Sequence, residues 1–436
     1  MIGAILLFIA IILYFKPKYR YLSYFLYLSF IMGGLNLWTD TVTGIKTMDM
    51  AVIYTFVISA YLVFAGKWKI PRWSIRKYYI AVIIMVIVCV FFSYVHYNLS
   101  PYQILQGGRN YLLLFSLPIF LMIKEDELKK ILRILLFFCI ITSVLYILQV
   151  ILKRPLMPYG EFSTDSTTGL PRFYNSPSNL TFFLVLSFIL PKFFKRNIWL
   201  YRALFFIAVI ATQGRTYIVT VICTILLATL MQGKMKRVGT ALAFLFIIIT
   251  PFYGVINDRF EGGGGTSDFT DIANGNYKFY TGDANDGGTM VYRFAWVYER
   301  WDYMEKRPLN ERLLGLGMVS DSQRWVYQHY KFSLGLENVE TGLPTQLSTP
   351  DISYGNILTK LGLLGGIVYL SFVLSLTIFV YQKRKVNVLI LLSTAIMITL
   401  FMTSFSCSSL SEPASFALVF AILSILCNHK KENILR

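Results

Sequence analysis

Cysteine, histidine and acidic residues are scarce in this chain, which carries 5 cysteines, 3 histidines, and 23 acidic against 41 basic side chains. The cysteines stand singly, with no CxxC pair and no spacing typical of a metal site. The sequence therefore predicts neither a disulfide nor a cysteine-bound metal. His329 is the only histidine of a long polar segment, and we expect it at the surface.

Acidic residues are almost absent from the apolar stretches of the chain. Ion-coupled transporters usually need carboxylates inside the membrane as proton or cation sites, so this scarcity argues against a pump or an antiporter. The acids between residues 260 and 290 are too irregularly spaced for a calcium-binding loop. That segment includes the glycine run 262–265 and is predicted to be a flexible lid. No metal and no other cofactor is predicted.

Apolar sequence is what the chain has in excess, because 56% of its residues are hydrophobic and 16% are aromatic. A helix needs about 20 apolar residues to cross a bilayer core of roughly 30 Å, and shorter helices are tolerated inside a bundle or at a polar cavity. The sequence predicts an all-α fold, a polytopic transmembrane helical bundle of about 13 spans. These are 2–14, 21–38, 50–65, 78–97, 111–123, 134–152, 176–190, 200–212, 217–231, 241–256, 352–381, 386–405 and 414–427.

One long polar interruption divides the chain into three parts. Residues 1–255 hold spans 1 to 10, residues 256–351 form a large loop, and residues 352–436 hold spans 11 to 13 with a basic tail. Within the loop, aromatic residues recur at helical spacing between residues 289 and 307. We therefore expect the loop to fold into a small helical cap over the bundle.

Basic residues follow every odd-numbered span, and short cytoplasmic loops retain Lys and Arg. The clusters begin at Lys16, Lys67, Lys124, Lys192, Lys234, Lys383 and Lys430. This pattern predicts an extracytoplasmic N-terminus, a cytoplasmic C-terminus and an extracytoplasmic large loop, in the inner (cytoplasmic) membrane. The first span lacks a basic flank and a small-residue cleavage site, so we expect a retained helix. The positive net charge is a topology signal and does not predict a nucleic-acid partner.

Polar groups gather where the predicted spans meet the outer face. They are Arg109 in QGGRNY, Arg172 in LPRFYNSPSN, Arg215 in TQGRTY, Arg293 in VYRFAW and Asp351 in STPDISYGN. We expect four arginines and one carboxylate to face one cavity. Arg215 is the most specific of these, since positive charge is least expected in a short outer connection. It either binds an anion such as a phosphate or contacts loop carbonyls and lipid headgroups.

Several of these segments, in their order along the chain, resemble bacterial O-antigen polymerases and O-antigen ligases. The resembling parts are RFYNSPSN, GRT at 214–216, RFAWVYERW leading to RPLNERLLGLG, and TPDISYGNILTKLGLLGG at 349–366. Ligases place a histidine seven residues before the leucine that corresponds to Leu358, where this chain has Asp351. That difference favours a polymerase.

The resemblance implies a glycosyltransferase that polymerises undecaprenyl-diphosphate-linked repeat units into O-antigen or capsular polysaccharide. Its partners would be lipid-linked glycan donor and acceptor, membrane lipid, a chain-length regulator and a flippase. Arginines stabilise a leaving diphosphate without a metal, and a carboxylate takes the proton of the acceptor hydroxyl. The expected catalytic residues are Asp351 and Arg215. The expected substrate-binding residues are Arg172, Arg293, Arg109, Asn356 and Tyr217.

Three other readings stay open from the sequence. An O-antigen ligase differs in its acceptor, and a lipid-linked oligosaccharide flippase also needs arginines for the diphosphate. A non-catalytic assembly partner needs neither a base nor paired arginines. Asp351 also suits the N-cap of the helix that follows it, because Thr349, Pro350 and Asp351 precede an apolar run.

Overall fold

The structure is a computed structural model that describes residues 2–38, 46–158, 162–164, 171–194, 197–250, 270–280, 289–337 and 342–434. In these ranges the chain is helical, apart from one two-stranded antiparallel sheet. The helices of the first part are α1 (Ile2–Tyr14), α2 (Arg20–Ile31), α3 (Thr47–Phe64), α4 (Arg76–His96), α5 (Pro101–Leu112), α6 (Leu117–Phe120), α7 (Glu125–Leu152), α8 (Leu180–Ile189), α9 (Ile198–Ala211), α10 (Arg215–Met231) and α11 (Met235–Ile249). The all-α prediction is confirmed for this part of the chain.

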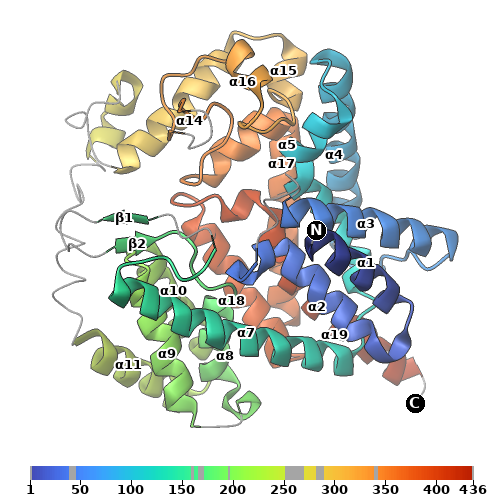
Figure 1. The fold of residues 1–436 in the computed structure, drawn as a ribbon, viewed down its shortest axis with the longest axis vertical. Helices are drawn as coiled ribbons and strands as arrows, with labels where there is room; N and C mark the ends of the chain where they lie inside the picture. The colour runs from blue at the N-terminus through green and yellow to red at the C-terminus, as the bar shows by residue number, and fades with distance from the viewer. Residues whose placement is uncertain are drawn as a thin grey trace.

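The remaining elements are a strand hairpin before the long polar interruption and helices within and after it. Strands β1 (Phe162–Thr164) and β2 (Pro171–Phe173) pair between α7 and α8. The later helices are α14 (Thr289–Glu305), α15 (Leu309–Leu314), α16 (Arg324–His329), α17 (Ser353–Lys383), α18 (Val388–Thr403) and α19 (Ala417–Ile434). Helices α14, α15 and α16 lie together at one end of the molecule, at the top of Figure 1. The expected flexible lid lies largely outside the described residues.

Four helices in the described ranges are long and apolar enough to cross a membrane: α3, α4, α7 and α17. The other apolar helices have 10 to 17 residues. Large apolar side chains on the long helices face outward, among them Phe64 at 91% and Phe91 at 65% exposed. Outward apolar surface of this kind on long helices indicates a membrane protein.

The fifth predicted span, 111–123, is wrong as a single helix. The chain is already helical from Pro101, turns through a 3-10 segment at Leu113–Ser116, and continues as the short α6. Pro118 lies in the first turn of α6, where its ring fixes the backbone and its missing N–H costs nothing. Helix α7 also begins nine residues before the expected span, because the Glu127 carboxylate accepts the backbone N–H of Lys124 at 2.9 Å.

Helix α17 is kinked at Gly362, which has φ 68° and ψ −170°. A Cβ at Gly362 would lie 2.4 Å from the backbone nitrogen of Gly315. Next to this contact, the Leu316 N–H donates to the Thr359 carbonyl at 2.7 Å. Two backbones therefore meet here, and the end of α15 is locked onto α17.

A second anchor joins α14 to the start of α17. Trp296 is fully buried, and a Cβ at Gly355 would lie 2.3 Å from its ring. The segment after α18 is fixed to the same place, since Ser353 donates from its backbone N–H to Ser404 and from its hydroxyl to Cys407. These contacts hold α14, α17 and the 404–412 segment in one arrangement.

Candidate functional site

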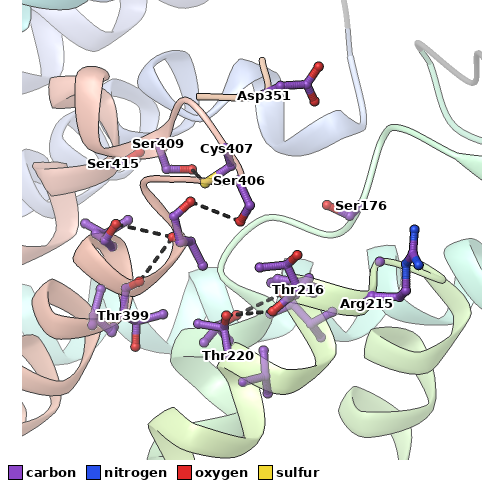
Figure 2. Close-up of a pocket in the computed structure, with 18 of the residues that line it drawn as sticks. Ser176, Arg215, Thr216, Thr220, Asp351, Thr399, Ser406, Cys407, Ser409 and Ser415 are labelled. Atoms are coloured by element: carbon purple, nitrogen blue, oxygen red, sulfur yellow. Dashed lines mark hydrogen bonds between the residues drawn. The ribbon is translucent and has the colours of Figure 1, made fainter. Parts of the chain in front are cut away.

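A cavity of about 800 Å³ lies where α8, α10 and α18 meet the beginnings of α14 and α17. Four of the predicted site residues line it together with Tyr217: Arg172, Arg215, Arg293 and Asp351. Figure 2 shows Arg215 on α10 and Asp351 on the segment before α17, on different walls of this cavity. Residues from five separate parts of the sequence therefore meet at one place.

Arg215 is the first residue of α10 and follows Gln213, whose backbone has a positive φ of 53°. The Gln213 side chain is buried and donates to the backbone carbonyl of Pro171 at 3.2 Å. The positive end of the α10 dipole lies beside the Arg215 guanidinium. Within the described residues, no carboxylate pairs with Arg215, so its charge is available to a bound anion.

Arg172 reaches the same cavity from strand β2, opposite Ser163 of β1. Its guanidinium lies 5.6 Å from the ring centroid of Tyr174. The following turn is rigid, because the buried Asn175 accepts from Gln149 at 2.9 Å and donates to the Pro158 carbonyl at 2.9 Å. Asn175 therefore has a positioning role, whereas Arg172 faces the cavity.

Asp351 lies opposite Arg293, which is near the start of α14. The distance between Nη2 of Arg293 and Oδ1 of Asp351 is 3.8 Å. The two side chains are 13% and 27% exposed, so the pair is open to the cavity. The expected capping role of Asp351 is wrong, since Ile352 is the N-cap of α17 and no side chain caps that helix. The carboxylate is thus turned to the arginine and not to the helix.

Tyr292 lies next to this pair on α14. Burial, with the Asp351 carboxylate as the second cause, raises the pKa of Tyr292 to about 12. Its hydroxyl therefore stays protonated at neutral pH. Tyr217, from α10, lines the cavity and shares a hydrogen bond of 2.8 Å with Thr181 of α8. That bond joins two walls of the cavity.

Hydroxyl groups form much of the remaining polar wall, and the sequence alone did not single them out. Thr216 and Thr220 come from α10, Thr399 from α18, and Ser406 from the segment after it (Figure 2). Thr403 of α18 also lines the cavity. Thr220 donates back to the Thr216 carbonyl at 2.6 Å. The signal was threonine spaced four residues apart in two apolar helices, which places the hydroxyls on one face of each helix.

Arg109 and Asn356 do not line this cavity, so the expectation of four arginines in one cavity is wrong for Arg109. They line a second cavity of about 290 Å³. Arg109 lies on helix α5, and its Nη1 is 3.2 Å from the Asp49 carboxylate of α3. Asn356 exchanges two hydrogen bonds with the backbone of Thr349, at 2.8 and 2.7 Å, and so positions the segment that carries Asp351.

The sequence did not single out Arg300, which has a structural role. It is fully buried and lies 3.9 Å above the ring of Trp296. Its guanidinium donates to the carbonyls of Gln346 and Thr345 at 3.1 and 3.2 Å and pairs with Glu299 at 2.6 Å. Burial lowers the pKa of Arg300 to about 10, which leaves it charged at neutral pH. It holds the backbone that leads to Asp351.

Among the described residues that line the first cavity, three guanidinium groups stand against one carboxylate, an excess of two positive charges. Guanidinium forks match phosphate oxygens, and a partly enclosed site strengthens that attraction. Within the described residues, no group of three His, Cys, Asp or Glu side chains is placed to hold a metal ion. The arrangement suits a ligand that carries about two negative charges next to a group that gives up a proton.

No protein-family model and no curated protein matches the chain. The geometry and charge of the cavity and the sequence motifs are therefore the grounds on which a function is proposed below.

Proposed function

We propose that this protein is a membrane glycosyltransferase that polymerises lipid-diphosphate-linked oligosaccharide repeat units. The observation that carries the proposal is the meeting of Arg172, Arg215 and Arg293 around one cavity with Asp351. The chain would cross the membrane about 13 times, with the helices α14 to α16 as a cap on the outer face. The lipid carrier would be undecaprenyl diphosphate, whose charge matches that of the cavity.

The proposed reaction joins the anomeric carbon of the donor glycan to a hydroxyl of the acceptor. Arg215 and Arg172 bind the diphosphate, and the N–H groups at the start of α10 add positive potential. The acceptor oxygen attacks the anomeric carbon while the bond from that carbon to the diphosphate oxygen breaks. The diphosphate leaves with the electron pair, and the hydroxyl proton passes to Asp351.

Arg293 has a positioning role in this scheme. The distance of 3.8 Å between its Nη2 and Oδ1 of Asp351 is too long for a hydrogen bond, which leaves room for the carboxylate to turn toward a hydroxyl. Tyr217, Thr216 and Thr220 line the cavity floor and offer hydrogen bonds to sugar or phosphate oxygens. An O-antigen ligase would use the same donor chemistry with a different acceptor.

To test this function, the length of the surface polysaccharide is measured in a host strain that depends on this gene. Arg215→Ala should abolish long chains at equal protein level, whereas Arg312→Ala should keep them. Arg312 is partly exposed on α15, donates to the Glu305 carbonyl and is not among the residues that line the cavity, so its replacement is a matched loss of charge outside the site. Full-length chains from Arg215→Ala would reject the proposal.

A further inference from the structure

The second cavity, of about 290 Å³, is not used by the chemistry above. It is lined by Arg109 and Asn110 from α5, Lys360 and Asn356 from α17, and Glu412 from the segment before α19. Its volume is near the lower end of small-molecule sites, which run from about 300 to 1,000 Å³. A ligand of this size is a single small ring and not a whole oligosaccharide.

Several of its polar groups have hydrogen-bonding capacity left over. In the described part of the chain, Oδ1 of Asn110 is buried and has no hydrogen-bond partner. The Lys360 ammonium has three donors and, among described residues, one recorded acceptor, the Val319 carbonyl. The Glu412 carboxylate accepts one recorded hydrogen bond, from Ser408 at 2.7 Å. Buried polar groups are normally satisfied, so these indicate a ligand or ordered water.

Charge balance separates this cavity from the first one. Arg109 is neutralised by Asp49 at 3.2 Å, and Lys360 shares its surroundings with Glu412 and Asp321. The site therefore has no positive excess and does not suit a diphosphate. Donors and acceptors lie side by side, which is the pattern that hydroxyl groups satisfy because each hydroxyl both donates and accepts.

The two cavities share a wall that is one chain thick. Thr349 and Pro350 line the second cavity, while the next residue, Asp351, lines the first. Likewise Ser408 lines the second cavity, while its neighbours Cys407 and Ser409 line the first. Consecutive Cα atoms are about 3.8 Å apart, so a sugar in the second cavity lies within about one sugar length of Asp351.

We propose that the second cavity binds one neutral, hydroxyl-rich sugar residue through Glu412, Lys360 and Asn110. Its assignment to the acceptor glycan rests on the proposed function, whereas sugar binding itself does not. Bound there, the acceptor chain would be held with its next sugar at Asp351. The cavity would then select the sugar, and the first cavity would select the diphosphate.

The test is direct binding to the full-length protein in lipid nanodiscs. The probes are glucose, galactose and N-acetylglucosamine, each titrated through the millimolar range and followed by saturation-transfer NMR, with inorganic pyrophosphate as a separate ligand. We expect at least one sugar to bind. Glu412→Gln should weaken it about tenfold or more, because a hydrogen bond to a charged group is lost. Asn110→Ala should also weaken it, and its unpartnered oxygen makes it the variant least costly to folding.

The control variant is Arg215→Ala, which should lose pyrophosphate binding and keep sugar binding. The inference is overturned when no sugar binds folded wild type, when binding survives both substitutions, or when pyrophosphate displaces the sugar. Failure of wild type to bind pyrophosphate, with sugar binding intact and sensitive to Asn110→Ala, would count against the proposed function alone.

Discussion

The side-chain amide of Gln213 donates to the backbone carbonyl of Pro171 at 3.2 Å. This bond ties the turn that begins α10 to strand β2, and each partner is within two residues of an arginine that lines the cavity. Arg215 and Arg172, which are far apart in the sequence, are thereby held on neighbouring walls. The side of the cavity that we propose to bind the anion is built on this contact.

Removal of Arg215 is expected to damage the reaction and not the fold. Arg215→Ala should lower the polymerisation rate about 10²- to 10³-fold, the usual effect of losing one group that stabilises developing charge. Thermal unfolding should be unchanged, because the side chain is half-exposed and pairs with no carboxylate in the described residues. Arg215→Lys should recover part of the rate, since it restores charge without the fork. A rate equal to wild type in Arg215→Ala would reject the assignment.

Asp351 and Arg293 are expected to act as a coupled pair. Asp351→Asn and Arg293→Ala should each lower kcat, and the double variant should lose less than the sum of the two losses. Residues in contact show coupling of about 0.5–3 kcal/mol in such cycles. The measurement is a double-mutant cycle on the initial rate. Strictly additive losses would show that the contact between Arg293 and Asp351, at 3.8 Å, does not contribute to the reaction.

The contact of Gly362 with Gly315 predicts a strong effect of one methyl group. Gly362→Ala should destabilise the protein, because φ 68° with ψ −170° is open essentially only to glycine and strain there costs about 1–3 kcal/mol. The added Cβ would also meet the Gly315 nitrogen at 2.4 Å. Gly239→Ala on α11 is the matched control, since nothing lies within 4 Å of its Cβ position. Thermal melting in detergent compares the two, and equal midpoints would contradict the interlock.

Buried Arg300 is expected to be structural. Arg300→Met should cost about 3–5 kcal/mol, because it removes the ion pair with Glu299 and the donors to the carbonyls of Thr345 and Gln346. Arg324→Ala, at an exposed position in α16, should be neutral. Chemical unfolding of both variants gives the comparison. A stable, inactive Arg300→Met protein would instead point to a role in the reaction.

Acid should loosen the attachment of α15 to α4. Burial favours the neutral form of Glu311, but hydrogen bonds from Arg307 and His96 outweigh it and lower the pKa below its usual 4.5. A folded pKa below the unfolded one adds stability above pH 4.5, and that stability is lost as the pH falls through the folded value. Glu311→Gln should flatten the dependence of melting temperature on pH below about 4.5. An unchanged acid slope in this variant would exclude Glu311 as its source.

The sequence predicted the helices that are uninterrupted apolar runs between charged residues, such as α1, α9 and α10. Apolar residues favour both burial and contact with lipid, so their composition is enough to predict such a helix. It did not predict α5. Residues 98–110 lay between two predicted spans, but the segment is helical from Pro101, and a Cβ at Gly107 would lie 2.3 Å from the Val319 backbone. Gly107 and Gly108 allow close packing of a helix, which turned Arg109 toward the second cavity.

The site was predictable where charge stood out from its surroundings and hidden where it did not. Arg172, Arg215, Arg293 and Asp351 are exceptions in apolar or outer sequence, and all four line one cavity. The threonine wall was not visible, because threonine in apolar helices commonly bonds to its own backbone, as Thr220 does. Glu412 was overlooked because Arg109 and Lys360, which line the second cavity with it, come from helices that are distant in the sequence.

The most direct test of the central claim uses purified protein in lipid vesicles with one defined undecaprenyl-diphosphate-linked repeat unit, and products sized on a gel. A ladder of polymer, with one undecaprenyl diphosphate released for each bond formed and both absent in Arg215→Ala, is the predicted result. Folded wild-type protein that leaves the single repeat unit unjoined, or only moves it across the bilayer, would contradict the account.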